Sequence, residues 1–384
     1  MHFATHSVAG LAVALFSCTS LVQAEPFDEP LATEPTNSVT SVATPYPASY
    51  AVVHDFAFGS LIDSAFSLVD TADGRFKGML SAGNFATIDV SMARQEFYVG
   101  ETYYSRGTRG DRVDLVTVYD MANLDRVAEI EVPKKRAAIV VNKGATAITA
   151  SGKFFLMFNL TPATSVSVVD LDTRAFVSEI TTPGCSLVYP TQLHDFFMLC
   201  GDGSLLDISL NEDGSVQSRT KSDVFIDIDA DPLSEKSSKV RDTWHFVSFK
   251  GDVQPIDADA VPGERWPLTS TDERAANWRP AGWHWTAGHP DGLLWVGMTP
   301  NGYDGSHKDP AAEVWLFDVD ERQRLKRIPL QTLALSIDVT LEDDPRLLVV
   351  NAEGALDIYD AKTGEYQRSI YDLGASPYQV HRMP

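Results

Sequence analysis

Short apolar runs separated by polar turns recur along residues 48–384, and the runs have the two patterns that strands show. Residues 166–169 (VSVV) alternate between apolar and polar, whereas residues 314–317 (VWLF) are apolar throughout. These patterns indicate strands with one or both faces covered. Seven segments share one plan, a β-type run, a turn and a second β-type run, which predicts an all-β chain. The residues that enter the seven turns are Asp70, Asp120, Asp170, Ser209, Asp257, Asp318 and Asp360.

The spacing of these turns indicates the architecture. Successive turn-entry residues are 50, 50, 39, 48, 61 and 42 positions apart. Self-similarity at about 40 to 50 residues with all-strand content is typical of a β-propeller, so we predict a seven-bladed β-propeller over residues 48–384. Each aspartate is expected to accept hydrogen bonds from backbone N–H groups two residues further on and so to fix its turn. The longest interval contains an insertion in which Asp272–Ala276 is expected to form a helical turn.

The first 47 residues differ from the repeats. Residues 8–16 (VAGLAVALF) are apolar, and Val22-Gln23-Ala24 suits a signal peptidase, so residues 1–24 are predicted to be a signal peptide and Glu25 the first mature residue. The alternative is a lipobox at residues 15–18, which would make Cys18 a lipidated anchor. Residues 25–47 are rich in Pro, Thr, Ser and Ala, and we expect a flexible N-terminal arm.

Cysteine usage agrees with export. Cleavage after Ala24 leaves two of the three cysteines, Cys185 and Cys200. A pair in an oxidising compartment is most simply a disulfide, and so short a loop would hold one local hairpin together. The alternative is two unpaired buried thiols.

Charge and hydropathy exclude two classes of partner. The chain has 31 Lys plus Arg against 53 Asp plus Glu, a formal net charge of -22. Such a field repels the phosphate backbone, so nucleic acid is not an expected partner. No apolar stretch after residue 24 approaches the roughly 20 residues that span a bilayer, so we expect no membrane insertion of the mature chain.

No constellation in the sequence predicts catalysis by this chain alone. His284 and His289 lie near each other, but no Cys or carboxylate falls at a usual zinc spacing, so we expect no metal site. Two His-Asp dipeptides, at 54–55 and 194–195, invite a general-base interpretation. Adjacent residues on a strand point to opposite faces, however, and packing is the better explanation. We therefore predict no catalytic residue in this chain.

Several stretches carry a resemblance to a known family. The sequence resembles the large (heavy) subunit of tryptophan tryptophylquinone amine dehydrogenases, which include methylamine and aromatic amine dehydrogenases. The similarity runs through nearly the whole mature chain and includes loops as well as strands. It also implies a seven-bladed propeller and a Cys185–Cys200 bridge. The stretches are TYYSRGTRGDRVDLVTVYD (102–120), TPATSVSVVDLD (161–172), CSLVYPT and FFMLCGDGSLLDISL (within 185–210), NWRPAGWHW (277–285) and GSHKDPAAEVWLFD (305–318).

The resemblance implies that the cofactor and the catalytic residue belong to a different subunit from this chain. The tryptophan tryptophylquinone and the catalytic aspartate belong to a small cysteine-rich subunit, and two large plus two small subunits are expected. This chain would dock that subunit and shape the channel of a periplasmic enzyme that oxidises primary amines to aldehyde and ammonia. Electrons would pass to a blue copper protein of the azurin or amicyanin type.

The resemblance also assigns roles to individual aromatic residues. Phe58 sits where family members place a channel-lining phenylalanine, with Phe56 as the second candidate and core packing as the alternative for either. Trp278, Trp283 and Trp285 are expected to pack loops or an interface.

Two other classes of function remain open at this point. One is a non-catalytic periplasmic propeller that serves as a binding or assembly module. The other is a self-sufficient quinoprotein or lactonase propeller, which needs a cofactor site or metal-ligand ring that the sequence does not offer. A neighbouring gene for a short, cysteine-rich protein would favour the amine dehydrogenase.

Overall fold

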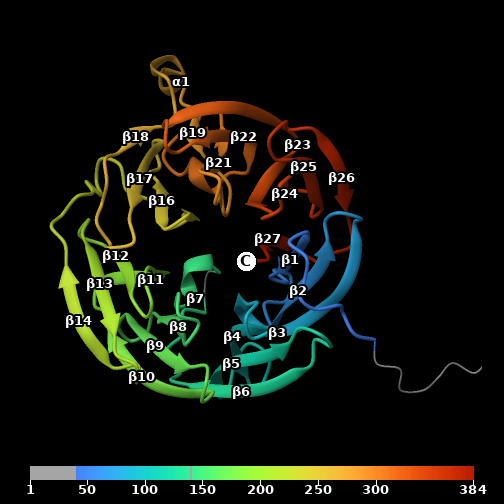
Figure 1. Cartoon of the computed structure of the whole chain (residues 1–384), viewed down its shortest axis with the longest axis vertical. Coiled ribbons are helices and arrows are strands. Elements are labelled where there is room, and N and C mark those ends of the chain that lie inside the picture. Colours follow the sequence, from blue (N-terminus) through green and yellow to red (C-terminus); the bar gives the residue numbers. More distant parts are fainter. Residues whose placement is uncertain (1–39, 139–140) are drawn as a thin grey trace, which may run out of the picture. The chain divides into compact units, whose positions relative to one another are not determined.

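The computed structural model describes residues 40–138 and 141–384. The predicted signal peptide and most of the predicted arm lie outside the described residues. Ser41–Pro384 form one compact unit, in which antiparallel sheets are arranged around a central axis (Figure 1). The predicted all-β class is confirmed, and the arrangement is consistent with a β-propeller. In the described part of the chain, no helix has the length and apolar character needed to cross a bilayer.

The sheets follow the chain in order, and in the four-stranded sheets of residues 146–181 and 185–221 the first strand in sequence lies nearest the axis (Figure 1). The first sheet has the order β27 (Pro377–Arg382), β1 (Tyr50–Asp55), β2 (Asp63–Asp70), β3 (Arg75–Ser91), β4 (Glu96–Tyr104), β5 (Arg112–Asp120) and β6 (Arg126–Val132). Three four-stranded sheets follow: β7 (Thr146–Ile148), β8 (Phe154–Asn159), β9 (Ser165–Asp170) and β10 (Ala175–Thr181); β11 (Cys185–Pro190), β12 (Phe196–Cys200), β13 (Leu205–Leu210) and β14 (Val216–Lys221); β15 (Ser238–Val240), β16 (Thr243–Val247), β17 (Asp252–Ile256) and β18 (Trp266–Pro267).

The last sheet contains eight strands. Its order is β19 (Arg279–Pro280), β21 (Leu293–Thr299), β22 (Ala311–Asp318), β23 (Gln323–Val339), β24 (Arg346–Asn351), β25 (Leu356–Asp360) and β26 (Tyr366–Ile370), and β20 (Thr286–His289) also pairs with β21. Two short 3-10 helices, η1 (Lys143–Ala145) and η2 (Ser306–Lys308), precede β7 and β22.

Two long strands connect consecutive groups of strands. β3 and β23 each have 17 residues. The first part of β3 pairs with β2 up to Gly83, and the part from Asn84 pairs with β4. In β23 the change of partner falls at Ala334, which is opposite Ala311 of β22 and Asn351 of β24. Each long strand therefore runs from one group of strands into the next.

The C-terminal strand closes the ring. β27 pairs with β1 in antiparallel register, with Val53 opposite Val380, and the C-terminus lies near the axis in Figure 1. Both valines are fully buried in a cluster that also contains Leu348 and Ile358 from β24 and β25. Apolar burial of this kind is the main stabilising term for the closure, because it removes valine and leucine side chains from water.

Strands between neighbouring sheets are covered on both faces. All six residues of β9 are buried, and so are Val314 to Phe317 of β22. The wholly apolar run 314–317 predicted this burial, whereas the alternating run 166–169 indicated one covered face, and the structure also buries its Ser167. Burial on both faces follows from sheets that pack face to face, so that both sides of an interior strand meet side chains.

The predicted aspartate turns are confirmed at six of the seven positions. In each, the carboxylate accepts a hydrogen bond from the backbone N–H two residues on, at distances from 2.9 to 3.1 Å. The exception is the turn after Ser209. There Asp213 accepts hydrogen bonds from the backbone N–H and hydroxyl of Ser215. A carboxylate thus fixes this turn too, from a later position. The six are Asp70, Asp120, Asp170, Asp257, Asp318 and Asp360.

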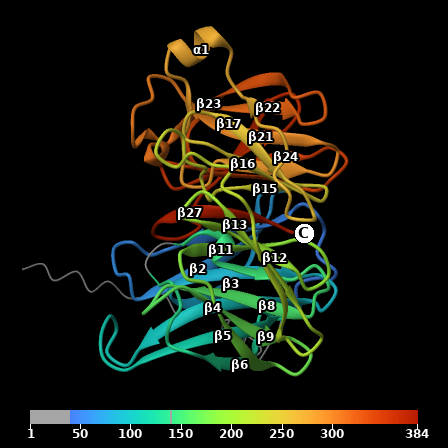
Figure 2. The same ribbon diagram turned by 90° about the vertical axis from the view of Figure 1, so that its left-hand side faces the viewer.

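The predicted helical turn in the insertion is also confirmed, with slightly different bounds. α1 (Thr271–Ala275) projects from the outer edge of the sheets (Figures 1 and 2). Ser270 and Glu273 form a capping box in which each side chain accepts from the other residue's backbone N–H. This reciprocal cap satisfies N–H groups that so short a helix cannot satisfy itself.

The described end of the predicted arm lies against the first sheet. The Val42 N–H donates to the Ala122 carbonyl at 2.6 Å, and the Tyr46 hydroxyl donates to the Met121 carbonyl at 2.5 Å. Tyr46 is buried, and its ring lies near those of Tyr50 and Phe97. Packed contacts therefore begin at about Val42, before the predicted domain boundary at residue 48.

Candidate functional site

The connections between strands lie on two opposite faces of the sheets, and the two faces differ in the length of the connections that they carry. Successive strands are antiparallel, so connections alternate between the two ends of the sheets. The aspartate turns all join a third strand to an outer strand and share one face. The opposite face, which we call the loop face, carries the longer connections 56–62, 222–237, 268–285 and 300–310. Long loops on a rigid scaffold are where binding surfaces are usually built.

An aromatic cluster lies on the loop face and consists of Phe56, Phe58, Trp283 and Tyr378. The ring of Phe58, in the connection after β1, lies 5.6 Å from the ring of Phe56 and 5.0 Å from the ring of Tyr378 on β27. Tyr378 lies 5.0 Å from Trp283. Phe58 is 45% exposed, whereas Phe56 is 2% exposed. Phe58 is therefore the surface member of the cluster and Phe56 a core residue, while the channel role of Phe58 stays a prediction.

A cavity of about 400 Å³, with both charged and apolar groups in its wall, lies among the inner strands. Its wall includes Asp89 on β3, Lys143 on η1, Lys239 on β15 and Asp338 on β23. We call it the axial cavity. The Asn142 side chain accepts a hydrogen bond from the Gly144 N–H and caps η1, which positions Lys143.

Asp338 joins three elements in this wall. Its carboxylate accepts a hydrogen bond from the Lys143 ammonium at 2.7 Å and another from the Arg382 backbone N–H at 3.2 Å. Burial raises the pKa of Asp338, but the positive charges of Lys143 and Arg382 outweigh burial and hold that pKa below its ordinary value. Burial also lowers the pKa of Lys143, which Asp338 partly offsets. Lys143 and Asp338 thus stabilise each other's charged forms, and loss of either partner would leave the other as an uncompensated buried charge.

Other titratable groups in the cavity wall are driven toward their neutral forms. Burial raises the pKa of Asp89 to about 7, so this carboxyl changes its charge near neutral pH. Burial, together with the positive charge of Lys143, lowers the pKa of His284 and His381 well below the ordinary value. Both imidazoles are neutral at physiological pH. The axial cavity therefore combines a charged pair, Lys143 and Asp338, with groups whose charged forms burial disfavours.

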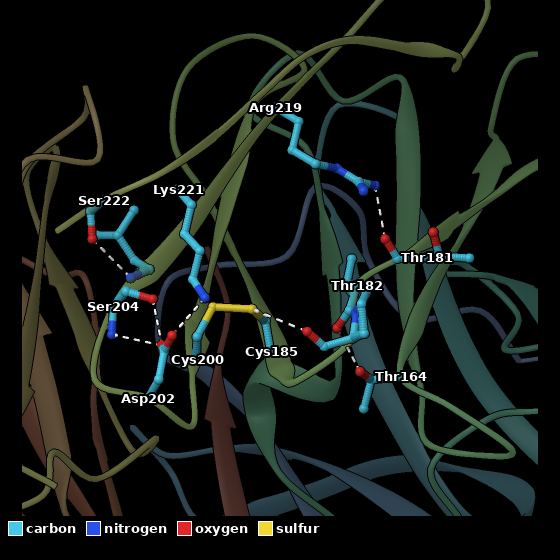
Figure 3. The surroundings of a disulfide bond; sticks show 12 residues. Thr164, Thr181, Thr182, Cys185, Cys200, Asp202, Ser204, Arg219, Lys221 and Ser222 are labelled. Atoms are coloured by element: carbon cyan, nitrogen blue, oxygen red, sulfur yellow. Dashed lines mark hydrogen bonds and ion pairs between the residues drawn. A yellow bond between two sulfur atoms is a disulfide. The ribbon is translucent and has the colours of Figure 1, made fainter. Parts of the chain in front are cut away.

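The predicted disulfide is present. Cys185 of β11 and Cys200 of β12 are directly paired, their Cα atoms are 3.9 Å apart, and a sulfur–sulfur bond joins them (Figure 3). Residues 201–204 connect β12 to β13. In this turn Asp202 accepts hydrogen bonds from the Ser204 N–H and hydroxyl and pairs with Lys221 at 2.6 Å. The bridge holds two adjacent strands, as the sequence predicted.

The histidines singled out in the sequence do not form a metal site. In residues 40–138 and 141–384, no group of three or more His, Cys, Asp or Glu side chains is placed to hold a metal ion. His284 faces the axial cavity, and His289 is buried on β20. The His194 ring contacts Ser151 at 2.7 Å and Glu212 at 3.1 Å, which gives it a structural role on the face of the aspartate turns.

His54 and Asp55 point in different directions, as expected for neighbours on a strand. His54 is fully buried, and its ring lies 4.2 Å from each of the Phe56 and Phe66 rings. Asp55 instead accepts hydrogen bonds from backbone N–H groups, including that of Ala57 at 2.8 Å. They do not act as a pair.

The singled-out tryptophans pack loops. Trp278 lies 5.1 Å from Trp315, and the Arg327 guanidinium lies over both rings. Trp285 is buried beneath the ammonium of Lys236. Trp283 belongs to the aromatic cluster and donates its indole N–H to the Val141 carbonyl.

Four residues of the axial cavity, of the aromatic cluster and of the packing around Trp285 were not predicted from the sequence: Lys143, Asp338, Tyr378 and Lys236. Lys143 and Asp338 are 195 positions apart, so no local motif links them. One signal was available for Asp338, because it is a lone charge in the apolar run ALSIDV, and a charge in a buried strand needs a partner. Tyr378 carried no comparable signal.

The fold and the site together define a class: a propeller-like all-β scaffold with an aromatic cluster on its loop face, of which Phe58 is the exposed member. The profile of the methylamine dehydrogenase heavy chain (MADH) family matches residues 48–383. The methylamine dehydrogenase heavy chain of Methylorubrum extorquens is 29% identical over 347 residues, which cover 88% of this chain and 83% of the relative. That of Methylophilus methylotrophus is 28% identical over 324 residues, which cover 82% and 79%.

A solved structure of dihydro-heme d1 dehydrogenase NirN in complex with DHE is similar in fold, with a TM-score of 0.52 and 17% identity over 92% of this chain and 79% of that one. The chain belongs to the methylamine dehydrogenase heavy chain family, which confirms the resemblance. Membership supports an amine dehydrogenase large subunit and implies a small-subunit partner that carries a quinone.

Proposed function

We propose that this chain is the large subunit of a periplasmic amine dehydrogenase, that it docks the small subunit on the loop face, and that Phe58 lines the entrance for the amine. One observation carries the proposal: an exposed phenylalanine, backed by Phe56, Tyr378 and Trp283, stands on the loop face in a chain of this family. Exposed aromatic groups on a soluble protein are typical of an interaction surface.

The aromatic cluster suits an amine substrate. Primary amines are ammonium cations at neutral pH, and the faces of Phe, Tyr and Trp attract cations. The net charge of -22 also attracts cations toward the protein as a whole. The reaction we propose is oxidation of a primary amine, with water, to aldehyde and ammonia. The choice between aliphatic and aromatic amines depends on the shape of the entrance.

The quinone is proposed to be tryptophan tryptophylquinone on the small subunit, and it would supply the acceptor for the two electrons that oxidation of the amine releases. Three tryptophans of this chain have packing roles instead. Trp278 and Trp315 lie against Arg327, and Trp285 lies against Lys236. This chain would contribute by positioning the small subunit on its loop face, and Phe58 would limit which amines approach.

The remaining elements of the proposal follow from the same family. If β3 and β23 each serve as the outer strand of one blade and the inner strand of the next, and β19 and β20 together form one inner strand, the sheets divide into seven four-stranded blades. Two large and two small subunits form the enzyme, and a blue copper protein of the azurin or amicyanin type receives the electrons. The Cys185–Cys200 bridge supports export to the periplasm, where disulfides persist.

Co-expression tests the proposal. The mature chain alone should show no quinone absorbance and no amine oxidation with an artificial electron acceptor. Co-expression with the small subunit and its maturation proteins should give a complex of both subunits that oxidises primary amines. A chain that forms no complex with the small subunit would instead be a non-catalytic binding or assembly module, and turnover by the isolated chain would also contradict the proposal.

A further inference from the structure

A second cavity lies beside the aromatic cluster. Its volume is about 370 Å³, and Trp283 of the cluster forms part of its wall. It adjoins the axial cavity, because Glu235 and His284 line both. We call it the lysine cavity after Lys236, which lies in its wall.

Lys236 has few partners for a buried cation. It is 7% exposed, its ammonium donates to the Gly282 carbonyl at 3.1 Å, and it lies 4.3 Å from the centre of the Trp285 ring. Its chain neighbour Glu235 offsets the effect of burial on its pKa only in part, and in the described ranges the two form no salt bridge. Burial lowers its pKa to about 8. An ammonium can donate three hydrogen bonds, so Lys236 has capacity for another acceptor.

Gln379 of β27 supplies a second unused group. It also lines the lysine cavity and is 1% exposed. Neither atom of its side-chain amide has a hydrogen-bond partner among the residues that the structure describes. A buried amide without a partner is costly, and such groups in native proteins usually have a ligand or water to bind.

The charge of the wall favours an anion. Lys236 and Lys308 contribute two positive charges against the one carboxylate of Glu235. Burial lowers the pKa of His284 and His307, so neither adds charge at neutral pH. We propose that the lysine cavity binds a carboxylate group, which accepts hydrogen bonds from the Lys236 ammonium and the Gln379 amide.

Titration of the isolated mature chain with sodium benzoate tests this directly. Benzamide serves as the neutral probe of similar shape, at constant ionic strength. Calorimetry, or the fluorescence of Trp283 and Trp285, should show tighter binding of benzoate than of benzamide. Lys236→Met should weaken benzoate about tenfold or more, because it removes a charge-assisted hydrogen bond. Gln379→Leu should also weaken it and provides a second variant.

Lys239→Met is the matched control. Lys239 is also a lysine whose pKa burial lowers, but it lines the axial cavity and not the lysine cavity. The control should leave benzoate affinity unchanged.

The carboxylate has two possible sources, a free solute or the docked small subunit, and a second arm distinguishes them. This arm rests on the proposed function. If benzoate still binds the assembled complex, the source is a free solute. If benzoate no longer binds and Lys236→Met, but not Lys239→Met, weakens assembly, the small subunit supplies the carboxylate.

Equal binding of benzoate and benzamide by the isolated chain, together with normal assembly of Lys236→Met, would overturn the proposal. Where the chain forms no complex at all, the titration of the isolated chain decides alone. Failure of the carboxylate site therefore stays distinguishable from failure of the proposed function.

Discussion

The backbone N–H of Ser376 donates a hydrogen bond of 2.9 Å to the carboxylate of Asp55, 321 positions away in the sequence. The same carboxylate accepts from Ala375 at 2.6 Å and from Ala57 at 2.8 Å. The preceding Gly374 has φ 139°, and a Cβ there would lie 2.3 Å from the Asp55 carboxylate. Asp55 therefore ties the end of β1 to the segment that leads into β27, beside the aromatic cluster.

Replacing Asp55 should weaken the closure of the ring. Asp55→Ala leaves three part-buried backbone N–H groups without their acceptor, which should lower the free energy of unfolding by about 1 to 3 kcal/mol. Chemical denaturation of the isolated chain measures the effect. Asp344→Ala, at an exposed turn, is the control and should change stability by less than about 0.5 kcal/mol. Equal effects of the two substitutions would show that Asp55 does not hold the ends together.

The Cys185–Cys200 bridge should contribute measurable stability. In the chain-entropy model, a loop of about 15 residues is worth about 3 kcal/mol, so Cys185→Ser with Cys200→Ser should lower the free energy of unfolding by about 2 to 4 kcal/mol. The change should be lost when both proteins are compared under reducing conditions. A variant as stable as the wild type in oxidising buffer would contradict this role.

Intact mass tests the proposed processing. The mature chain is expected to start at Glu25 and to gain two mass units on reduction, since one disulfide takes up two hydrogens. Alkylation without reductant should modify no cysteine. A chain that retains residues 1–24, or that carries a lipid at Cys18, would contradict cleavage after Ala24.

The features that the sequence predicted are local ones. An aspartate that caps its own turn acts over two residues, so Asp170 or Asp360 can be interpreted from its immediate neighbours. Cys185 and Cys200 lie on adjacent strands joined by one short connection. The regular recurrence of these local units then predicted the propeller-like arrangement, because each unit needs neighbours to cover its faces.

The candidate site depends on contacts between distant strands. Lys143 meets Asp338, and Tyr378 meets Phe58, only because the ring of sheets brings their elements together near the axis. No spacing in the sequence encodes these pairs. Phe58 was assigned from a family resemblance, and its 45% exposure could not be deduced from the surrounding sequence.

The loss of local stability at acid pH should depend on Glu273, which caps α1. Burial raises the pKa of Glu273, but hydrogen bonds from Arg324 and Ser270 outweigh it, and the pKa is lowered to about 2. The unfolded value is near 4.3. A depressed pKa gives stability that is present above about pH 4.3 and is lost as the pH falls toward 2. Glu273→Gln should therefore lower the protection of residues 268–285 from hydrogen exchange at pH 7, and the difference should shrink below about pH 4.

Glu264→Gln provides the control for this effect, since Glu264 is exposed and forms an ion pair with Arg322 at the surface. Exposed pairs contribute little. If both substitutions gave the same difference at every pH, the Glu273 carboxylate would not be the group that titrates.

The exposed ring of Phe58 should govern which amines the assembled enzyme accepts. Phe58→Ala removes an apolar contact at the proposed entrance, and contacts of this size change discrimination by about 1 to 3 kcal/mol, or about 10 to 200-fold. The ratio of kcat/KM for a short amine to that for a bulky amine should change within this range, measured on the complex with the small subunit. Because Phe58 is 45% exposed, its loss should leave the melting temperature almost unchanged.

Phe76→Ala is a control that separates the effect of where the ring lies from the effect of losing an exposed ring. Phe76 lies on β3 and is 55% exposed. Phe76→Ala therefore removes a ring of comparable exposure that lies away from the aromatic cluster. This control should leave the amine preference as in the wild type. Phe56→Ala, which removes a ring that is 2% exposed, should instead cost about 3 to 5 kcal/mol of stability. An unchanged amine preference in Phe58→Ala, with the complex intact, would remove Phe58 from the channel and leave the loop face with a docking role alone.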